Sequence, residues 1–170
     1  MAAQTQYIFS TGKVRIGPVG ATLSDADHLI GAIQGANLDI TFQKAEVMET
    51  PQQSMFPVAV GFHSGNCRLR LEVESVDRRI WTSVMNAVAS NQGTANLYTI
   101  GKTTKPIFFK VELDGLDADG KQIKATLFKA CTTGIPLNFR LTNFATMSLD
   151  CEGYPSSTDS SKVCDVLMGQ

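Results

Sequence analysis

Apolar and polar residues alternate along much of this chain, most clearly between residues 107 and 152. Four segments of that half follow a period of two, which is typical of strands with one buried and one wetted face. Asp119-Gly120 and Thr133-Gly134 are turn signals between such segments. The four predicted strands cover residues 107–113, 122–129, 137–142 and 146–152. The second half of the chain is therefore predicted to be antiparallel sheet.

The first half shows the same alternation in three places. A short strand is predicted at residues 14–16, a longer one at 37–43, and a third at 67–74. Residues 44–61 lie between the last two and contain two prolines, so they are predicted to form a long connection.

Apolar residues recur with the period of a helix, near 3.6, in only one segment of the sequence. Asp77 is a candidate N-cap, and Asn91 and Gly93 are candidate helix-ending residues. The apolar stripe between them consists of Ile80, Trp81, Val84, Met85 and Val88. The pattern predicts one helix whose apolar stripe covers the sheet.

Length and composition fit a single domain. A chain of 170 residues with 43% hydrophobic residues can bury a core without metals or disulfides. We predict a mainly β fold, a β-sandwich or barrel with one flanking α-helix, over residues 1–154. Residues 155–170 are predicted to be a polar C-terminal tail or extension, loose from about Pro155 onward.

Charge and hydropathy limit the kinds of partner that we expect for this chain. Only 18% of the residues are charged, which suggests that other copies of the chain cover part of the surface. The net charge of −1 does not indicate a general binder of nucleic acid or anionic membrane. No apolar run approaches the roughly 20 residues of a membrane helix, and the first residues do not resemble a secretory signal. Synthesis in a cytoplasm is the expectation.

Candidate chemistry is sparse. Residues 114–120 are rich in Asp and Gly, but Gly115 and Thr126 occupy positions where a calcium loop needs carboxylates. A hairpin turn is the preferred interpretation. His28 and His63 each lie in a predicted loop without a second ligand type nearby, and no phosphate-binding, nucleophile or cofactor motif is present. We therefore expect no enzymatic activity, no cofactor and no metal.

The faces of the strands carry more information than any motif. With the apolar phase turned inward, including Leu38, Ile40 and Phe42, four strands share one continuous face without aromatic residues. We call this surface the polar face. It consists of Asn37, Asp39, Thr41, Gln43, Arg68, Arg70, Glu72, Glu74, Asn138, Arg140, Thr142, Thr146, Ser148, Asp150 and Glu152.

Two interpretations of the polar face stay open. Its five acids and three arginines give a net charge of −2 per chain. It is either the wetted face of a sandwich or barrel, or the wall of a water-filled channel. Such a wall would not hold a polyanion, because it offers few basic contacts to phosphates.

The four cysteines do not have the spacing of a zinc site. Cys67 and Cys151 continue the apolar phase of their strands and are predicted to be small buried hydrophobes. Cys164 lies in the polar tail, where nothing in the sequence buries it, and Cys131 lies at a strand end. Outside a cell, Cys131 and Cys164 are the candidates for disulfides between subunits.

Several short segments follow one another in an informative order. They are GANLDITF at 35–42, EVMET at 46–50, RLRLEV at 68–73, ADGK at 118–121, LFKA at 127–130, PLNF at 136–139 and FATMSL at 144–149. Each is weak alone, and their order carries the specificity. In that order, and with the single helix between them, they resemble the major tail tube proteins of bacteriophages over residues 12–154.

The resemblance implies assembly into a hexameric ring. Four strands from each subunit would close a continuous inner β-barrel around a lumen lined by the polar face, and stacked rings would form a tube. Met48, Glu49, Met55 and Phe56 would form a loop that contacts the next ring. The alternative is that these residues fold back on their own subunit.

The resemblance also implies partners and a place. A tape-measure protein and transiting DNA would occupy the lumen, and terminator and baseplate or tip proteins would bind the ends. A sheath protein would surround the tube where the tail contracts. The subunit would be made in the cytoplasm of a host bacterium and would become part of the virion tail.

Two alternatives remain. The tube protein of a type VI secretion system or of another contractile injection system would share this architecture. A small β-barrel that binds a ligand would instead need a pocket with convergent polar and aromatic groups, whereas the aromatic residues here fall mostly on the core phase.

Overall fold

The protein is mainly β. The computed structural model describes residues 12–47, 59–73, 77, 79–93, 95–101, 105, 107–116, 119–132, 134, 137–138, 146–159 and 161–168. Most of these residues lie in antiparallel strands, as the alternation predicts.

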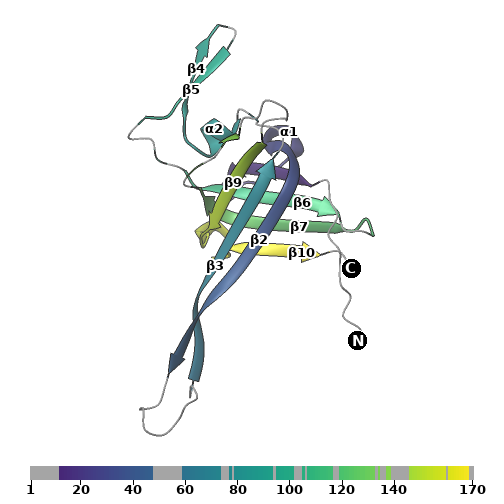
Figure 1. Cartoon of the computed structure of the whole chain (residues 1–170), viewed down its shortest axis with the longest axis vertical. Helices are drawn as coiled ribbons and strands as arrows, with labels where there is room; N and C mark the ends of the chain where they lie inside the picture. The colour runs from purple at the N-terminus through teal and green to yellow at the C-terminus, as the bar shows by residue number, and fades with distance from the viewer. Residues whose placement is uncertain are drawn as a thin grey trace.

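Eight strands form one sheet in the order β10-β7-β6-β1-β2-β3-β9-β8. They are β1 (Lys13–Pro18), β2 (Leu29–Val47), β3 (Ala59–Val73), β6 (Phe109–Leu116), β7 (Gln122–Cys131), β8 (Leu137–Asn138), β9 (Thr146–Gly153) and β10 (Cys164–Met168). The sheet bends, so that β2, β3 and β9 cross over β6, β7 and β10 (Figure 1). β7 also pairs with β9, but only at Ala130–Gly153 and Cys131–Glu152. The described strands therefore form a folded-over sheet and no closed barrel.

The core lies between the two halves of this bent sheet. Leu69 and Leu149 from one half, and Val111 and Leu127 from the other, are at most 1% exposed and belong to one hydrophobic cluster. These residues occupy the apolar phase of their strands, so the period of two in the sequence places them inside. Burial of this phase is what holds the two halves together.

The predicted helix is much shorter than expected. Helix α2 (Arg79–Ser83) starts at the predicted cap, where the Asp77 carboxylate accepts a hydrogen bond of 2.8 Å from the backbone N–H of Arg79. Ile80 and Val84 are buried as predicted. The prediction that the helix continues to Val88 was wrong, because Asn86 adopts a left-handed conformation with φ of 53° and redirects the chain.

A hairpin missed by the sequence pattern follows α2. Strands β4 (Val88–Gln92) and β5 (Ala95–Thr99) pair as a separate two-stranded sheet that projects from the main body (Figure 1). Gly93 has a φ of 74° at its turn. Of the two residues that suggested a helix end, Asn91 lies in β4 opposite Asn96 and Gly93 lies at the turn, and Val88 is 68% exposed.

The C-terminal segment is ordered by the sheet. After a 3-10 turn, η1 (Ser157–Asp159), β10 pairs with β7 from Cys164–Leu127 to Met168–Ile123. Ser156 is fully buried, and its N–H donates to the carbonyl of Lys162 at 3.0 Å. The expectation of a loose segment from Pro155 onward was therefore wrong for these residues.

The Asp-Gly-rich segment is a hairpin turn between β6 and β7, as preferred over a calcium loop. Gly120 has a φ of 76°, which favours glycine. Asp114 accepts hydrogen bonds from Arg15 at 3.2 Å and from Gln122 at 2.9 Å. No group of three or more His, Cys, Asp or Glu side chains suited to a metal ion occurs in the described part of the chain. Its helices are also too short or too polar to cross a membrane.

A cluster of charges fixes the segment between β1 and β2, which contains helix α1 (Asp25–His28). The Glu112 side chain is only 7% exposed and pairs with Lys110 at 3.2 Å and Lys124 at 2.8 Å. Lys110 also donates to the carbonyl of Ala21 at 3.1 Å. Burial raises the pKa of Glu112, but the hydrogen bonds and charges of Lys124 and Lys110 outweigh it and hold the pKa below its usual value.

We expect Glu112→Gln to lower the free energy of unfolding at pH 7 by about 2 kcal/mol, because an amide cannot neutralise two partly buried lysines. The pKa of the folded Glu112 lies below that of the unfolded chain, so its stabilisation is complete above the unfolded pKa of about 4.3. It is lost as the pH falls through the folded pKa. Urea denaturation from pH 7 downward should show the two proteins converging below about pH 4.

The control is Glu72→Gln, which alters an exposed glutamate of β3 and should change stability by less than about 0.5 kcal/mol. The difference in the free energy of unfolding between Glu112→Gln and the parent should shrink on acidification. If it stayed constant, the stabilising role of the ionised Glu112 would be contradicted.

Candidate functional site

Three neighbouring strands bring the described part of the polar face together. β2, β3 and β9 are consecutive in the sheet and antiparallel, so their residues line up in rows across it. The rows are Asp39–Arg68–Glu152, Asn37–Arg70–Asp150 and, on β3 and β9, Glu72–Ser148. One face of three strands thus carries only polar and charged side chains at these positions.

The opposite phase explains why these side chains face outward. Leu69, Leu71 and Leu149 alternate with them and are at most 1% exposed in the core. Because side chains of a strand alternate between faces, burial of the leucines fixes the arginines and carboxylates on the other side.

Both described arginines of the face converge on one carboxylate. Arg68 Nε donates to Asp150 Oδ1 at 2.6 Å and its Nη2 donates to Oδ2, while Arg70 Nε lies 3.7 Å from Asp150 Oδ2. The hydrogen bond to Asp150, and then its charge, raise the pKa of the Arg68 guanidinium. Two donors of Arg68 are therefore engaged within the face, and the positive charge of Arg70 lies near the same carboxylate.

The described face keeps a net negative charge. Four carboxylates stand against two guanidiniums, which gives −2. The carboxylates are Asp39, Glu72, Asp150 and Glu152. Glu152 also accepts a hydrogen bond of 3.0 Å from the Tyr154 hydroxyl, which fixes its orientation. The described residues of the face therefore form a largely exposed and weakly acidic surface.

The remaining residues of the predicted polar face and inter-ring loop are only partly covered by the structure. Thr41 is on β2 and exposed. Gln43, Asn138 and Thr146 lie in strands, but their side chains are not among those described. Glu74, Arg140, Thr142, Met48, Glu49, Met55 and Phe56 lie outside the described residues.

β2 and β3 extend well beyond the core as a long two-stranded arm (Figure 1). Leu38 packs against the core, but Ile40 is 46% exposed and Phe42 is 66% exposed. The prediction that all three are turned into the core was therefore wrong for the last two. Alternation predicts the face of a residue, but it does not show where the opposing layer ends.

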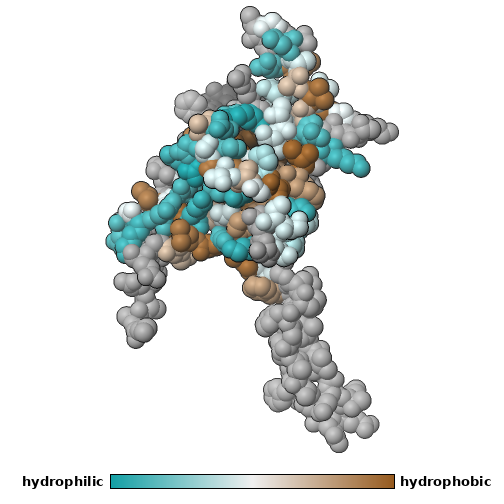
Figure 2. Space-filling view, turned by 180° about the vertical axis from the view of Figure 1, so that it is seen from behind, coloured by the Kyte–Doolittle hydropathy of each residue, from teal (hydrophilic) through white to brown (hydrophobic). Residues whose placement is uncertain are grey.

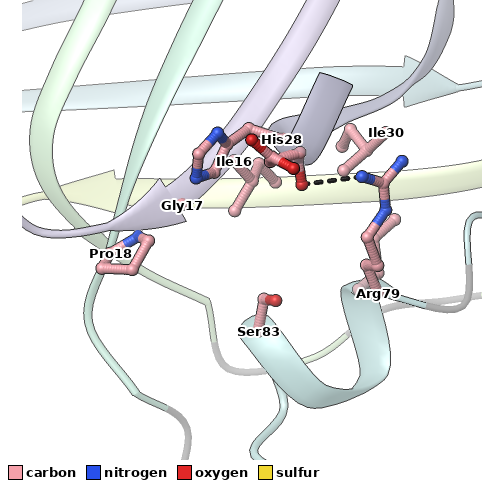
Figure 3. A pocket seen from close by; sticks show the side chains of 9 residues that line it. Ile16, Gly17, Pro18, His28, Ile30, Arg79 and Ser83 are labelled. Carbon is pink, nitrogen blue, oxygen red and sulfur yellow. Dashed lines mark hydrogen bonds between the residues drawn. The ribbon is translucent and has the colours of Figure 1, made fainter. Parts of the chain in front are cut away.

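A small pocket of about 160 Å³ lies apart from the polar face, between β1, α1 and α2 (Figure 3). Its lining includes Ile16, Pro18, His28, Ile30, Arg79 and Ser83, and no Phe, Tyr or Trp. Arg79 donates to the carbonyls of Asp27 at 2.7 Å and Leu29 at 2.6 Å, so its charge holds the end of α1 in place. Polar groups of Asp27, His28, Arg79 and Ser83 do converge there, but the pocket lacks the large aromatic side chains expected of a ligand-binding barrel.

The cysteines are partly as predicted. Cys67 is 2% exposed and Cys151 is fully buried, which confirms their assignment as core residues. Cys131 and Cys164 are half-buried, and Cys164 packs against the core. The expectation that nothing buries Cys164 was wrong, because β10 places it on the sheet. All four are free thiols within the chain, and a disulfide between subunits stays a prediction.

No family model and no curated protein matches the sequence. Solved structures do align along nearly the whole chain. The tube-terminating cap of the anti-feeding prophage aligns with a TM-score of 0.60 and 11% identity, covering 99% of this chain and 95% of that one. A chain of the extended sheath–tube complex of the PVC extracellular contractile injection system aligns with a TM-score of 0.56 and 10% identity, covering 98% and 94%.

The chain therefore has a tail-tube-like fold, which confirms the predicted resemblance at the level of architecture. These two neighbours are components of contractile injection systems. An Hcp protein aligns with a TM-score of only 0.40, too low to bear on the argument.

The exposed apolar residues of the arm lead to a prediction about self-association. We expect the double replacement of Ile40→Ser and Phe42→Ser to change the free energy of unfolding of the monomer by less than about 1 kcal/mol, because Ile40 is nearly half exposed and Phe42 is mostly exposed. The same change should weaken association between copies, which we expect to bury these side chains. Sedimentation over a concentration series and urea denaturation measure the two effects.

Leu116→Ser is a matched control, since Leu116 is 52% exposed at the β6–β7 turn, away from the arm. Equal association of the double variant and the parent would contradict a role of the arm in assembly.

Proposed function

We propose that this chain is the structural, non-enzymatic subunit of a tube. Copies assemble into hexameric rings, the polar face of β2, β3 and β9 lines the lumen, and stacked rings form a continuous conduit. The observation that carries the proposal is the continuous charged face on three adjacent strands of a tail-tube-like fold.

Uncovered apolar surface supports assembly. Ile40, Phe42, Val88, Leu97 and Leu116 are among the large hydrophobic side chains that the single chain leaves exposed. Figure 2 shows apolar patches interspersed with polar surface on the side opposite to that of Figure 1. Such surface on a protein with few charges is typical of a subunit that is covered by neighbours.

The charge of the face supports a passive conduit. Each phosphate contact by Lys or Arg adds affinity for nucleic acid, so a wall rich in unpaired basic groups would retain DNA. Here Arg68 and Arg70 are drawn to Asp150, and the face is net negative. A hexameric ring would multiply this weak repulsion around the lumen while keeping the wall hydrated.

We propose a bacteriophage tail as the primary setting, with the subunit made in the host bacterial cytoplasm. Its partners are other copies of itself, a tape-measure protein and DNA inside, terminator and baseplate or tip proteins at the ends, and a sheath if the tail contracts. The second candidate is the tube of a contractile injection system with a protein cargo. The TM-scores of 0.60 and 0.56 to components of such systems support this second candidate.

Charge reversal in the lumen tests the conduit. We expect Glu72→Lys with Glu152→Lys to leave ring assembly intact, because both residues are exposed and lie on the face away from the core. Genome ejection from particles that carry the variant should slow by roughly tenfold or more, since new basic groups bind phosphates. Electron microscopy checks assembly, and a DNA-release assay at low and high salt checks passage.

Asp119→Lys, at the exposed β6–β7 turn, is the control with the same sign of charge change. Ejection at the parental rate from intact double-variant particles would show that the face does not line the path of DNA.

A further inference from the structure

All four cysteines gather at one corner of the sheet, where β3, β7, β9 and β10 converge. Cys131 on β7 is opposite Glu152, the neighbour of Cys151 on β9. Cys151 in turn pairs with Leu69 of β3, two residues after Cys67. At the same corner, Cys164 opens β10 opposite Leu127 of β7. The cysteines are up to 97 positions apart in the sequence, and the topology brings them together.

Two of them, Cys67 and Cys164, lie close together in this corner. Cys164 packs against the buried cluster to which Cys67 belongs, and, after burial, its sulfur contributes to a raised pKa of the Cys67 thiol. The missing side chain of Gly153 permits this approach. A Cβ at that position would lie 3.0 Å from Val163 Cγ1 and 3.5 Å from Cys67 Cβ, so glycine leaves room for the start of β10 beside β3.

We propose that Cys67 and Cys164 are a site of oxidative modification, at which a small-molecule disulfide converts the two thiols into an intrachain disulfide. Cys164 is the more exposed and meets the oxidant first. Its thiolate attacks one sulfur of glutathione disulfide and releases one glutathione as a thiol. Cys67 then attacks the Cys164 sulfur of the mixed disulfide and releases the second glutathione. Two protein thiols are oxidised, one glutathione disulfide is reduced, and the two protons leave on the two glutathione thiols.

The surroundings favour this pair over the other cysteines. Cys151 is fully buried, and the Cys131 sulfur is directed to the carbonyl of its neighbour Thr132 at 3.7 Å. Burial, and then the adjacent Cys164 sulfur, raise the pKa of the Cys67 thiol, so Cys67 follows rather than initiates the exchange. Cys164 is therefore the thiol that attacks glutathione disulfide first.

The bond would change how the end of the chain is held. β10 is an edge strand attached to β7 through residue pairs from Cys164–Leu127 to Met168–Ile123. A disulfide would fasten its first residue to a central strand and would close a loop of somewhat more than half of the chain. This inference does not depend on the proposed tube function, since it concerns the folded single chain.

Peptide mapping tests the pairing directly, because trypsin places each cysteine on its own peptide. The four peptides cover residues 45–68, 130–140, 141–162 and 163–170. The full chain is incubated with glutathione disulfide at pH 8, unfolded, alkylated, digested and analysed by mass spectrometry. We expect a cross-link between 45–68 and 163–170 within monomers, in the parent and in Cys131→Ser, and none in Cys164→Ser.

Thermal unfolding gives a second readout. The oxidised parent and Cys131→Ser should melt higher than their reduced forms, by on the order of 10 °C, and Cys164→Ser should show no such gain. The inference is overturned by any of three outcomes for the parent chain. These are a Cys164 thiol that stays unreacted, a Cys164–glutathione adduct that never resolves, or a link from Cys164 to Cys131 or to another chain.

Discussion

The register of β3 between β2 and β9 is the constraint on which the rest of the structure depends. Leu69 and Leu71 enter the core only because Arg68 and Arg70 face the other way, and β2 and β9 follow the same phase. A slip by one residue would bury two guanidiniums and expose the leucines. Core stability and the composition of the polar face are therefore set by one pairing.

The same sheet has two very different surfaces. Toward the core, β3 and β9 present apolar side chains such as Leu69, Leu71 and Leu149. Toward solvent, ionic groups interact with each other, as in the convergence of Arg68 and Arg70 on Asp150. Pairing within the described part of the face leaves a weakly acidic surface. This is the kind of surface that we propose for the wall of a tube.

Sequence alternation predicted the strands and the faces well, because both depend on local chemistry. The buried phase of β3 and β9, the cap at Asp77 and the turn before β7 all follow from residue type and spacing. Errors arose where a tertiary partner decides the outcome. Asn86 stops α2 through a backbone conformation, and Ile40 stays exposed because the opposing layer has ended.

The C-terminal strand illustrates the same limit. Nothing in the polar run before Cys164 signals a strand, and only the free edge of β7 makes β10 possible. The proximity of Cys164 to Cys67 arises from that pairing and was not foreseeable from their spacing. Ring formation is likewise a property of surfaces between copies, which a single chain carries only as an exposed arm and apolar patches.

The central claim is that copies of this chain close into rings around the polar face, and electron microscopy of the concentrated purified protein tests it most directly. We predict hexameric rings or hollow tubes, with β2, β3 and β9 of every subunit at the inner wall. A protein that stays monomeric at high concentration, or rings with these strands on the outside, would contradict it.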